Sequence, residues 1–276
     1  MSTAVPPFVD WAWVEARRVD TALPQPILAD VRWTLAGPKH EEYLAGHLPG
    51  AVFVDVDTDL SDPASPERGR HPLPDPIHFA TRMGELGIDG TRPVIAYDDE
   101  GGVYAARLVW LLRALGHPAA VLDGGIAASP EPHTIEVPTP APVRFRASPW
   151  PAWLIAEADE VADLDDETVL IDARPAERFH GEDTVDPRPG HIPGARSIPT
   201  REHLVNGALA DLDTLRARFA AIGIERGTPV VSYCGSGVTA THNLLVLEHA
   251  GLGVGRLYPG SWSQWSADAS RPVVRD

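Results

Sequence analysis

Cysteine is almost absent from the sequence: Cys234 is the only one among 276 residues. A single cysteine excludes an internal disulfide, and it also excludes the paired Cys-x-x-Cys sites that bind metals or carry out redox exchange. If this thiol takes part in chemistry, it therefore acts without a second cysteine of the same chain.

Basic residues are scarce beside acidic ones, because 23 Lys and Arg stand against 39 Asp and Glu, and the formal net charge is -16. Such a charge repels nucleic acid and anionic membrane surfaces, so we expect neither as a partner. No run approaches the roughly 18 apolar residues of a membrane-spanning helix, and residues 1–7 lack the charge and apolar stretch of a signal peptide. We therefore expect a cytoplasmic protein.

Several motifs of other enzyme classes are missing as well. The sequence contains no Gly-x-x-x-x-Gly-Lys phosphate loop, no His-Glu-x-x-His metal motif and no Gly-x-Ser-x-Gly nucleophile turn. These absences argue against nucleotide hydrolysis, zinc proteolysis and serine hydrolysis. We expect no metal site and no organic cofactor.

The chain is long enough for two domains of middling size, and its two halves resemble each other. Each half has an apolar run that ends in Asp-x-Arg, a Gly-His-x-Pro-Gly-Ala turn and a Gly-Ile run that leads into a β-prone segment. In order, these motifs occupy residues 27–32 and 170–174, 46–51 and 190–195, and 87–97 and 223–233. The sequence therefore predicts two tandem domains with the same fold.

Prolines at residues 138–142 and 148–151 disfavour regular structure between the two halves. We place the domain boundary there, with an N-terminal domain at residues 1–145 and a C-terminal domain at residues 146–276. Short apolar runs alternate with amphipathic segments such as residues 104–115 and 213–222. Apolar strands followed by helices are typical of a buried, mostly parallel sheet with helices on both faces, so we predict the α/β class for each domain.

Cys234 follows a β-prone run that ends at Tyr233, and Gly235, Ser236 and Gly237 come directly after it. The glycines can adopt backbone angles closed to other residues, so successive N–H groups can point at one atom. A helix that begins near Val238 or Thr239 adds its positive N-terminal end. Both effects favour a thiolate, and they would also stabilise the terminal sulfur of a persulfide.

The corresponding loop of the first half, residues 98–102, has Asp98 where the second half has its cysteine. A carboxylate takes the position of the thiol and two more acidic residues follow, so this half cannot hold an anionic sulfur. We therefore interpret the first domain as a catalytically inactive copy. Residues that occur in both copies, including Arg32, Arg174, His47 and His191, are interpreted as structural, the arginines through a salt bridge at the end of a strand.

Together with the closing segment at residues 257–265, these motifs resemble the tandem-domain rhodanese-like sulfurtransferases, the family of thiosulfate and 3-mercaptopyruvate sulfurtransferases. The resemblance covers nearly the whole chain. It implies that a donor passes a sulfur atom to the catalytic Cys234, and that the persulfide then gives it to a thiol, to cyanide or to a thioredoxin-like protein. The Gly-Ser-Gly loop resembles the mercaptopyruvate type, since thiosulfate-type loops carry basic residues.

The resemblance also implies roles for further residues. Ser236, His71 and Asp57 would form a catalytic relay that handles the donor's proton, while Arg178 and Arg188 would bind the donor's carboxylate. The loop residues in contact with the substrate would be Gly235, Gly237, Val238 and Thr239. Three alternatives stay open: thiosulfate as the donor, a persulfide carrier without turnover, and a cysteine phosphatase, which lacks support because no arginine ends the loop.

Overall fold

The computed structural model describes residues 5–183 and 185–275, which form two compact units. Most of each unit comes from one half of the chain, but two short segments belong to the unit of the other half. The first unit contains the described residues up to Ser61, Pro74–Trp150 and Asn206–Leu209, and the second contains Asp62–Leu73, Pro151–Val205 and the described residues from Ala210 onward.

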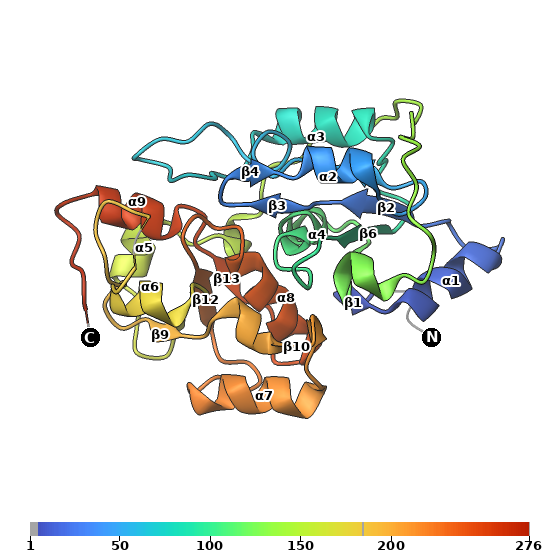
Figure 1. Ribbon diagram of the computed structural model, residues 1–276. Helices are drawn as coiled ribbons and strands as arrows, with labels where there is room; N and C mark the ends of the chain where they lie inside the picture. The colour runs from blue at the N-terminus through green and yellow to red at the C-terminus, as the bar shows by residue number, and fades with distance from the viewer. Residues whose placement is uncertain (1–4, 184, 276) are drawn as a thin grey trace. The chain divides into compact units, whose positions relative to one another are not determined.

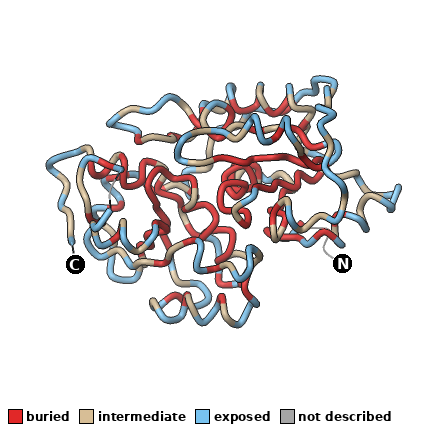
Figure 2. The backbone as a smooth tube through the Cα atoms, viewed as in Figure 1, coloured by how far each residue is buried: buried red, intermediate tan, exposed pale blue. Residues whose placement is uncertain are grey.

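The first unit is built on a parallel sheet with the strand order β1-β7-β6-β2-β5 (Figure 1). Its longer strands are buried at every residue, because helices cover both faces (Figure 2). The strands of this unit are β1 (Phe8–Val9), β2 (Ile27–Asp30), β3 (Trp33–Thr34), β4 (Gly37–Pro38), β5 (Val52–Phe53), β6 (Val94–Tyr97), β7 (Ala119–Leu122) and β11 (Ala208–Leu209).

The helices of the first unit lie on both faces of this sheet. Trp11 and Val14 of α1 pack in one apolar cluster with Ala120 and Leu122 of β7. Val121 of β7 points to the face of the sheet opposite to Ala120 and Leu122, because side chains alternate along a strand. A Cβ built on Gly102, just before α4, would meet the side chain of Val121, so α4 lies on that opposite face. The helices are α1 (Trp11–Val19), α2 (His40–Ala45), α3 (Pro76–Glu85), α4 (Ala105–Ala114) and the 3-10 helix η1 (Gly125–Ala128).

The second unit repeats this plan on a parallel sheet with the strand order β13-β12-β8-β9 (Figure 1). Val231 and Tyr233 of β12 join a cluster with Trp262 and Trp265 on one face. On the other face, the hydroxyl of Ser232 donates to the carbonyl oxygen of Ala240 in α8 at 3.1 Å. The strands are β8 (Val169–Asp172), β9 (Arg196–Ser197), β10 (Leu204–Val205), β12 (Val230–Tyr233) and β13 (Arg256–Leu257).

The helices of the second unit are η2 (Ala152–Leu154), α5 (Ala158–Ala162), α6 (Ala176–His180), η3 (Thr200–His203), α7 (Leu212–Ala221), α8 (Ala240–His249) and α9 (Ser261–Ala267). The α/β class predicted for both halves is confirmed. Within the described ranges, no helix combines the length and the apolar character needed to cross a membrane.

The duplicated motifs make the same contacts in both units, as the sequence predicts. Arg32 pairs with Asp30, and Arg174 pairs with Asp172, in each case at the carboxyl end of a strand. Each arginine also donates, at 2.8 Å, to a backbone carbonyl oxygen of the Gly-His turn, Gly46 in the first unit and Gly190 in the second. The structural interpretation of the two arginines is confirmed.

Candidate active site

Cys234 lies directly after β12, at the carboxyl end of the sheet, and only 2% of it is exposed. The backbone N–H of Gly237 donates a hydrogen bond of 3.1 Å to its Sγ. Gly237 has a φ of 78°, and a Cβ there would lie 2.6 Å from the carbonyl oxygen of Pro259, so both conformation and packing require glycine. The loop thus aims a backbone donor at the sulfur, which favours an anionic sulfur at this position.

The first turn of α9 holds the cysteine loop in place. The hydroxyl of Ser261 accepts a hydrogen bond of 3.2 Å from the backbone N–H of Cys234. The carbonyl oxygens of Cys234 and Gly235 accept from the backbone N–H groups of Trp262 and Ser263, at 3.0 and 2.9 Å. Ser261 itself has a φ of 52°, a left-handed conformation that costs free energy for a residue other than glycine. The hydroxyl of Ser261 also donates to the carbonyl oxygen of Tyr258 at 2.8 Å, so the turn is tied to the backbone on both sides.

Ser236 and His71 are brought together as the resemblance implies. The Oγ of Ser236 and the Nδ1 of His71 share a hydrogen bond of 2.7 Å, and Ser236 is 7% exposed. His71 comes from Asp62–Leu73, which belongs to the second unit although its neighbours in sequence lie in the first. The serine and the histidine are therefore part of one unit with Cys234.

The segment Asp62–Leu73 is held against the cysteine loop by backbone contacts. Gly69 has a φ of 87°, and a Cβ there would lie 2.6 Å from the carbonyl oxygen of Gly260. The next residue, Arg70, donates its backbone N–H to the hydroxyl of Ser263 at 3.0 Å. This close approach of two backbones positions Arg70 and His71 beside the loop.

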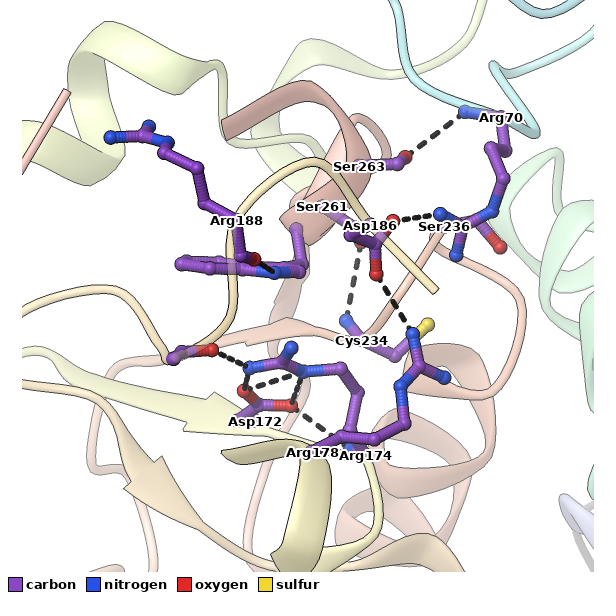
Figure 3. A network of polar contacts seen from close by, with 12 residues as sticks. Arg70, Asp172, Arg174, Arg178, Asp186, Arg188, Cys234, Ser236, Ser261 and Ser263 are labelled. Carbon is purple, nitrogen blue, oxygen red and sulfur yellow. Dashed lines mark hydrogen bonds and ion pairs between the residues drawn. The ribbon is translucent and has the colours of Figure 1, made fainter. Parts of the chain in front are cut away.

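Two guanidinium groups, those of Arg70 and Arg178, lie near the cysteine loop and both contact Asp186 (Figure 3). A Cβ built on Gly235 would lie 2.8 Å from the Nη2 of Arg70 and 3.1 Å from the Nη2 of Arg178. Both arginines form ion pairs with Asp186, and the pair from Arg178 Nη2 to Asp186 Oδ2 measures 2.8 Å. The site therefore presents two cations on one side of the thiol, joined by a buried carboxylate.

The electrostatics of the two arginines reflect this crowding. Burial lowers the pKa of Arg70, and the positive charge of Arg178 lowers it further, while Cys234 acts in the opposite direction. Burial also lowers the pKa of Arg178, together with the nearby charge of Arg174, and Cys234 again opposes the effect. Since an arginine remains charged even with a lowered pKa, both groups are available to hold an anion.

A third arginine below the site is already neutralised. The Nε of Arg174 donates to Asp172 Oδ1 at 3.0 Å, and its guanidinium lies 4.8 Å from the ring centroid of Trp262. Burial acts to lower the pKa of Arg174, but the ion pair with Asp172 reverses this, and the net pKa is raised. This pair supports the end of β8 and carries no free charge toward a ligand.

Arg188 does not reach the site. Its guanidinium points away from the cysteine cluster (Figure 3) and donates to the backbone carbonyl oxygens of Trp265, Ser266, Asp268 and Arg271, at distances from 2.6 to 2.9 Å. It thus ties down the turn after α9. The carboxylate-binding role that the resemblance implies for Arg188 does not agree with this arrangement, because its donors are committed to the backbone.

Three further predicted site residues are Asp57, Val238 and Thr239. Asp57 belongs to the first unit, where its Oδ1 accepts a hydrogen bond of 3.0 Å from the indole N–H of Trp33. Val238 and Thr239 form the turn into α8: their carbonyl oxygens accept from the hydroxyls of Thr241 at 2.6 Å and Thr200 at 3.3 Å. The helix begins at Ala240, one residue later than the latest start predicted.

The matching loop of the first unit is filled by its own carboxylate. Asp98 is fully buried. Its Oδ1 accepts from the backbone N–H groups of Glu100 at 2.8 Å and Gly102 at 2.7 Å. Its Oδ2 accepts from those of Tyr104 at 2.7 Å and Ala105 at 2.9 Å. Burial raises the pKa of Asp98 and the four N–H groups act to lower it, so the carboxylate occupies an anion site built from backbone donors.

Sequence reasoning missed Arg70, Asp186, Ser261 and Ser263. Arg70 directly precedes His71, and Asp186 lies two residues before Arg188. This adjacency to predicted site residues was the available signal. In the part of the chain that the structure describes, no cluster of three or more His, Cys, Asp or Glu side chains is arranged to hold a metal ion.

Comparison with known proteins agrees with this geometry. The model of the "Rhodanese-like domain" family matches residues 10–129 and 157–268. The chain is 38% identical to the 3-mercaptopyruvate sulfurtransferase of Escherichia coli (strain K12), over 96% of this chain and 97% of that protein. It is also 38% identical to SseB of Mycobacterium tuberculosis, whose name provisionally assigns it thiosulfate sulfurtransferase activity, over 90% of each chain.

Solved structures agree as well. The crystal structure of SseA from Escherichia coli, a 3-mercaptopyruvate sulfotransferase with a "rhodanese" fold, superposes with a TM-score of 0.81 at 34% identity, over 94% of this chain and 99% of that chain. The family model, the extent of these matches and the cysteine loop at the sheet edge lead to one conclusion: the chain belongs to the rhodanese-like family.

Proposed function

We propose that the protein is a sulfurtransferase that takes a sulfur atom from 3-mercaptopyruvate onto Cys234 and passes it to a thiophilic acceptor. The observation that carries this proposal is the surroundings of the sole thiol: a backbone N–H 3.1 Å from Sγ and two guanidinium groups over the adjacent Gly235. The backbone N–H stabilises an anionic sulfur, and the guanidinium groups bind a donor carboxylate. The 3-mercaptopyruvate sulfurtransferases among its relatives support the same donor.

In the first half-reaction the thiolate of Cys234 attacks the sulfur of 3-mercaptopyruvate, and the new S–S bond forms as the donor's C–S bond breaks. The electron pair of that bond goes to the carbon as the enolate of pyruvate. The thiol proton of the donor is transferred to this carbon, which leaves pyruvate and a Cys234 persulfide anion. The reaction is a two-step covalent process, and ping-pong kinetics follow from it.

In the second half-reaction the acceptor attacks the outer sulfur, and the S–S bond electrons return to Cys234 as a thiolate. Cyanide, a small thiol or a thioredoxin-like protein has the nucleophile that this step requires. Such thiols are kept reduced in the cytoplasm, so we propose that the protein acts there.

The direct test is the intact mass of the protein, freed of reductant, after separate incubation with 3-mercaptopyruvate and with thiosulfate. The mass should increase by one sulfur atom, and the increase should disappear when cyanide is added. If neither donor adds sulfur to Cys234, the protein does not carry out this reaction.

A relay of Ser236, His71 and Asp57 would move the donor's proton, and the 2.7 Å hydrogen bond between Ser236 and His71 supports it. We expect His71→Ala to slow 3-mercaptopyruvate turnover by about 10²-fold, the size of a general acid-base contribution. Thiosulfate turnover should fall much less, because that donor gives up no proton. The measurement is kcat with each donor, with His133→Ala as the control at an exposed histidine. Equal losses with both donors would remove proton transfer from the role of His71.

Arg178 would bind the donor's anionic group, and we expect Arg178→Ala to raise KM for 3-mercaptopyruvate by about 10-fold to 100-fold. The lost interaction is a charge-assisted hydrogen bond, worth about 1.5–3 kcal/mol. Initial rates over a range of donor concentrations give the value, and Arg226→Ala at an exposed arginine is the control. An unchanged KM would place Arg178 outside the donor site.

Thiosulfate is the second candidate donor, because the arginines beside the thiol can also hold an anion that has no carboxylate, and one relative carries that name. Its sulfane sulfur would form the same persulfide, with sulfite as the leaving group.

We further propose that the first unit is catalytically inactive, since the carboxylate of Asp98 accepts hydrogen bonds from the backbone N–H groups of its loop. A persulfide carrier would load sulfur but release it slowly to small acceptors, and turnover rates distinguish this alternative.

A further inference from the structure

Asp186 lies between the two arginines of the site, and its side chain is 1% exposed. Its Oδ1 pairs with Arg70 Nη1 and its Oδ2 pairs with Arg178 Nη2 (Figure 3). The two cationic partners offset the cost of burying this carboxylate in its ionised form. Asp186 is therefore the internal counter-ion of a pair of arginines that would otherwise repel each other.

The arginine pair faces the reacting sulfur. The Nη2 atoms of Arg70 and Arg178 would be 2.8 and 3.1 Å from a Cβ at Gly235, the residue after Cys234. The two arginines differ in exposure, with 32% of the Arg70 side chain and 11% of the Arg178 side chain accessible. The Nε of Arg178 is buried and has no hydrogen-bond partner among the residues that the structure describes.

The charge of this cluster follows from its members. Arg174 is compensated by Asp172 and adds no net charge. The two remaining arginines carry two positive charges and Asp186 carries one negative charge, which leaves one positive charge while Cys234 is a neutral thiol and none once it is a thiolate. In either state Asp186 lowers the positive charge offered to a ligand by one, and a dianion loses more by this than a monoanion, because its attraction to the cluster scales with its own charge.

We infer that Asp186 is a specificity determinant that matches the site to a singly charged donor, and that Arg70 is a second donor-binding cation. The inference rests on the proposed function and adds to it the charge class of the donor. 3-Mercaptopyruvate with a protonated thiol is a monoanion, whereas thiosulfate is a dianion. Asp186 therefore disfavours thiosulfate relative to the keto acid, although two arginines are present.

The test compares monovalent and divalent anions in the Cys234→Ser form of the full chain, so that no turnover is needed. Calorimetric titration with pyruvate and with sulfate gives the ratio of their dissociation constants. We expect Asp186→Asn to shift this ratio toward sulfate by about tenfold, because one negative charge is removed. Arg70→Gln should shift it toward pyruvate, and Arg70→Lys should restore most of the original ratio. Asp213→Asn, at a side chain that is 96% exposed, is the matched control.

The same substitutions in the protein with Cys234 intact should move the ratio of kcat/KM for thiosulfate and 3-mercaptopyruvate in the same directions. If Asp186→Asn does not fold, Arg70→Gln and Arg70→Lys decide the question. Unchanged binding ratios in the folded variants would overturn the inference, whatever the activity. Shifted ratios without a persulfide on Cys234 would instead leave the charge assignment standing and reject the proposed sulfur transfer.

Discussion

Replacement of Cys234 with serine is expected to abolish sulfur transfer from both 3-mercaptopyruvate and thiosulfate, with a loss on the order of 10⁴-fold or more. The reason is covalent: the hydroxyl of serine cannot form a persulfide, and no other cysteine is present to take the sulfur. The hydroxyl still accepts the N–H of Gly237, so the loop has no reason to change its backbone. Steady-state rates with cyanide as the acceptor, together with the intact mass after incubation, measure the effect.

Two controls make this result interpretable. Cys234→Ala tests whether the serine hydroxyl itself contributes, and the midpoint of urea unfolding tests whether the fold is retained. Because Cys234 is 2% exposed and its serine replacement is nearly isosteric, we expect the midpoint to change little. Residual transfer above about one hundredth of the wild-type rate, with the loop intact, would mean that the sulfur does not pass through this cysteine.

The duplicated motifs made the fold predictable from the sequence, because they encode local contacts. Asp-x-Arg places a carboxylate and a guanidinium two residues apart at the end of a strand, and both pairs form as expected. The Gly-His-x-Pro-Gly-Ala turn then supplies a carbonyl oxygen to the same arginine. Such contacts depend on a few neighbouring residues and on the register of one strand.

The composition of the site was less predictable, because its remaining contacts join residues far apart in the chain. Arg70 meets Asp186, which is 116 residues away, and its N–H meets Ser263, which is 193 residues away. No local pattern shows that Asp62–Leu73 packs with the second unit. A charged residue in a loop without periodicity can only be assigned once its long-range partners are known.

Arg188 shows the opposite difficulty. The family resemblance implied that Arg188 binds the donor's carboxylate, but its guanidinium binds carbonyl oxygens at the end of α9. Backbone acceptors carry no signature in the side-chain sequence, since every residue has one. The end of a helix can therefore take up an arginine that a family resemblance assigns to a ligand.

The largest loss of stability is expected at the ion pair behind the site. Asp172→Ala removes the carboxylate that accepts from the Nε of Arg174 at 2.9 and 3.0 Å. Arg174 is 2% exposed, so its charge would stay buried with no anionic partner on β8. We expect the free energy of unfolding of the second unit to fall by about 3–5 kcal/mol. Urea unfolding followed by tryptophan fluorescence measures this change.

The same pair allows a test of the cause. If the loss comes from an uncompensated charge, replacement of both members by apolar residues, Asp172→Leu with Arg174→Met, should recover more than half of it, because the desolvation cost is removed with the charges. Asp213→Ala is the control, since its pair with Arg216 is exposed and should change stability by less than about 0.5 kcal/mol. If the double variant is less stable than Asp172→Ala, packing of the Arg174 stem on Trp262 and its bond to Gly190 contribute more to stability than charge balance does.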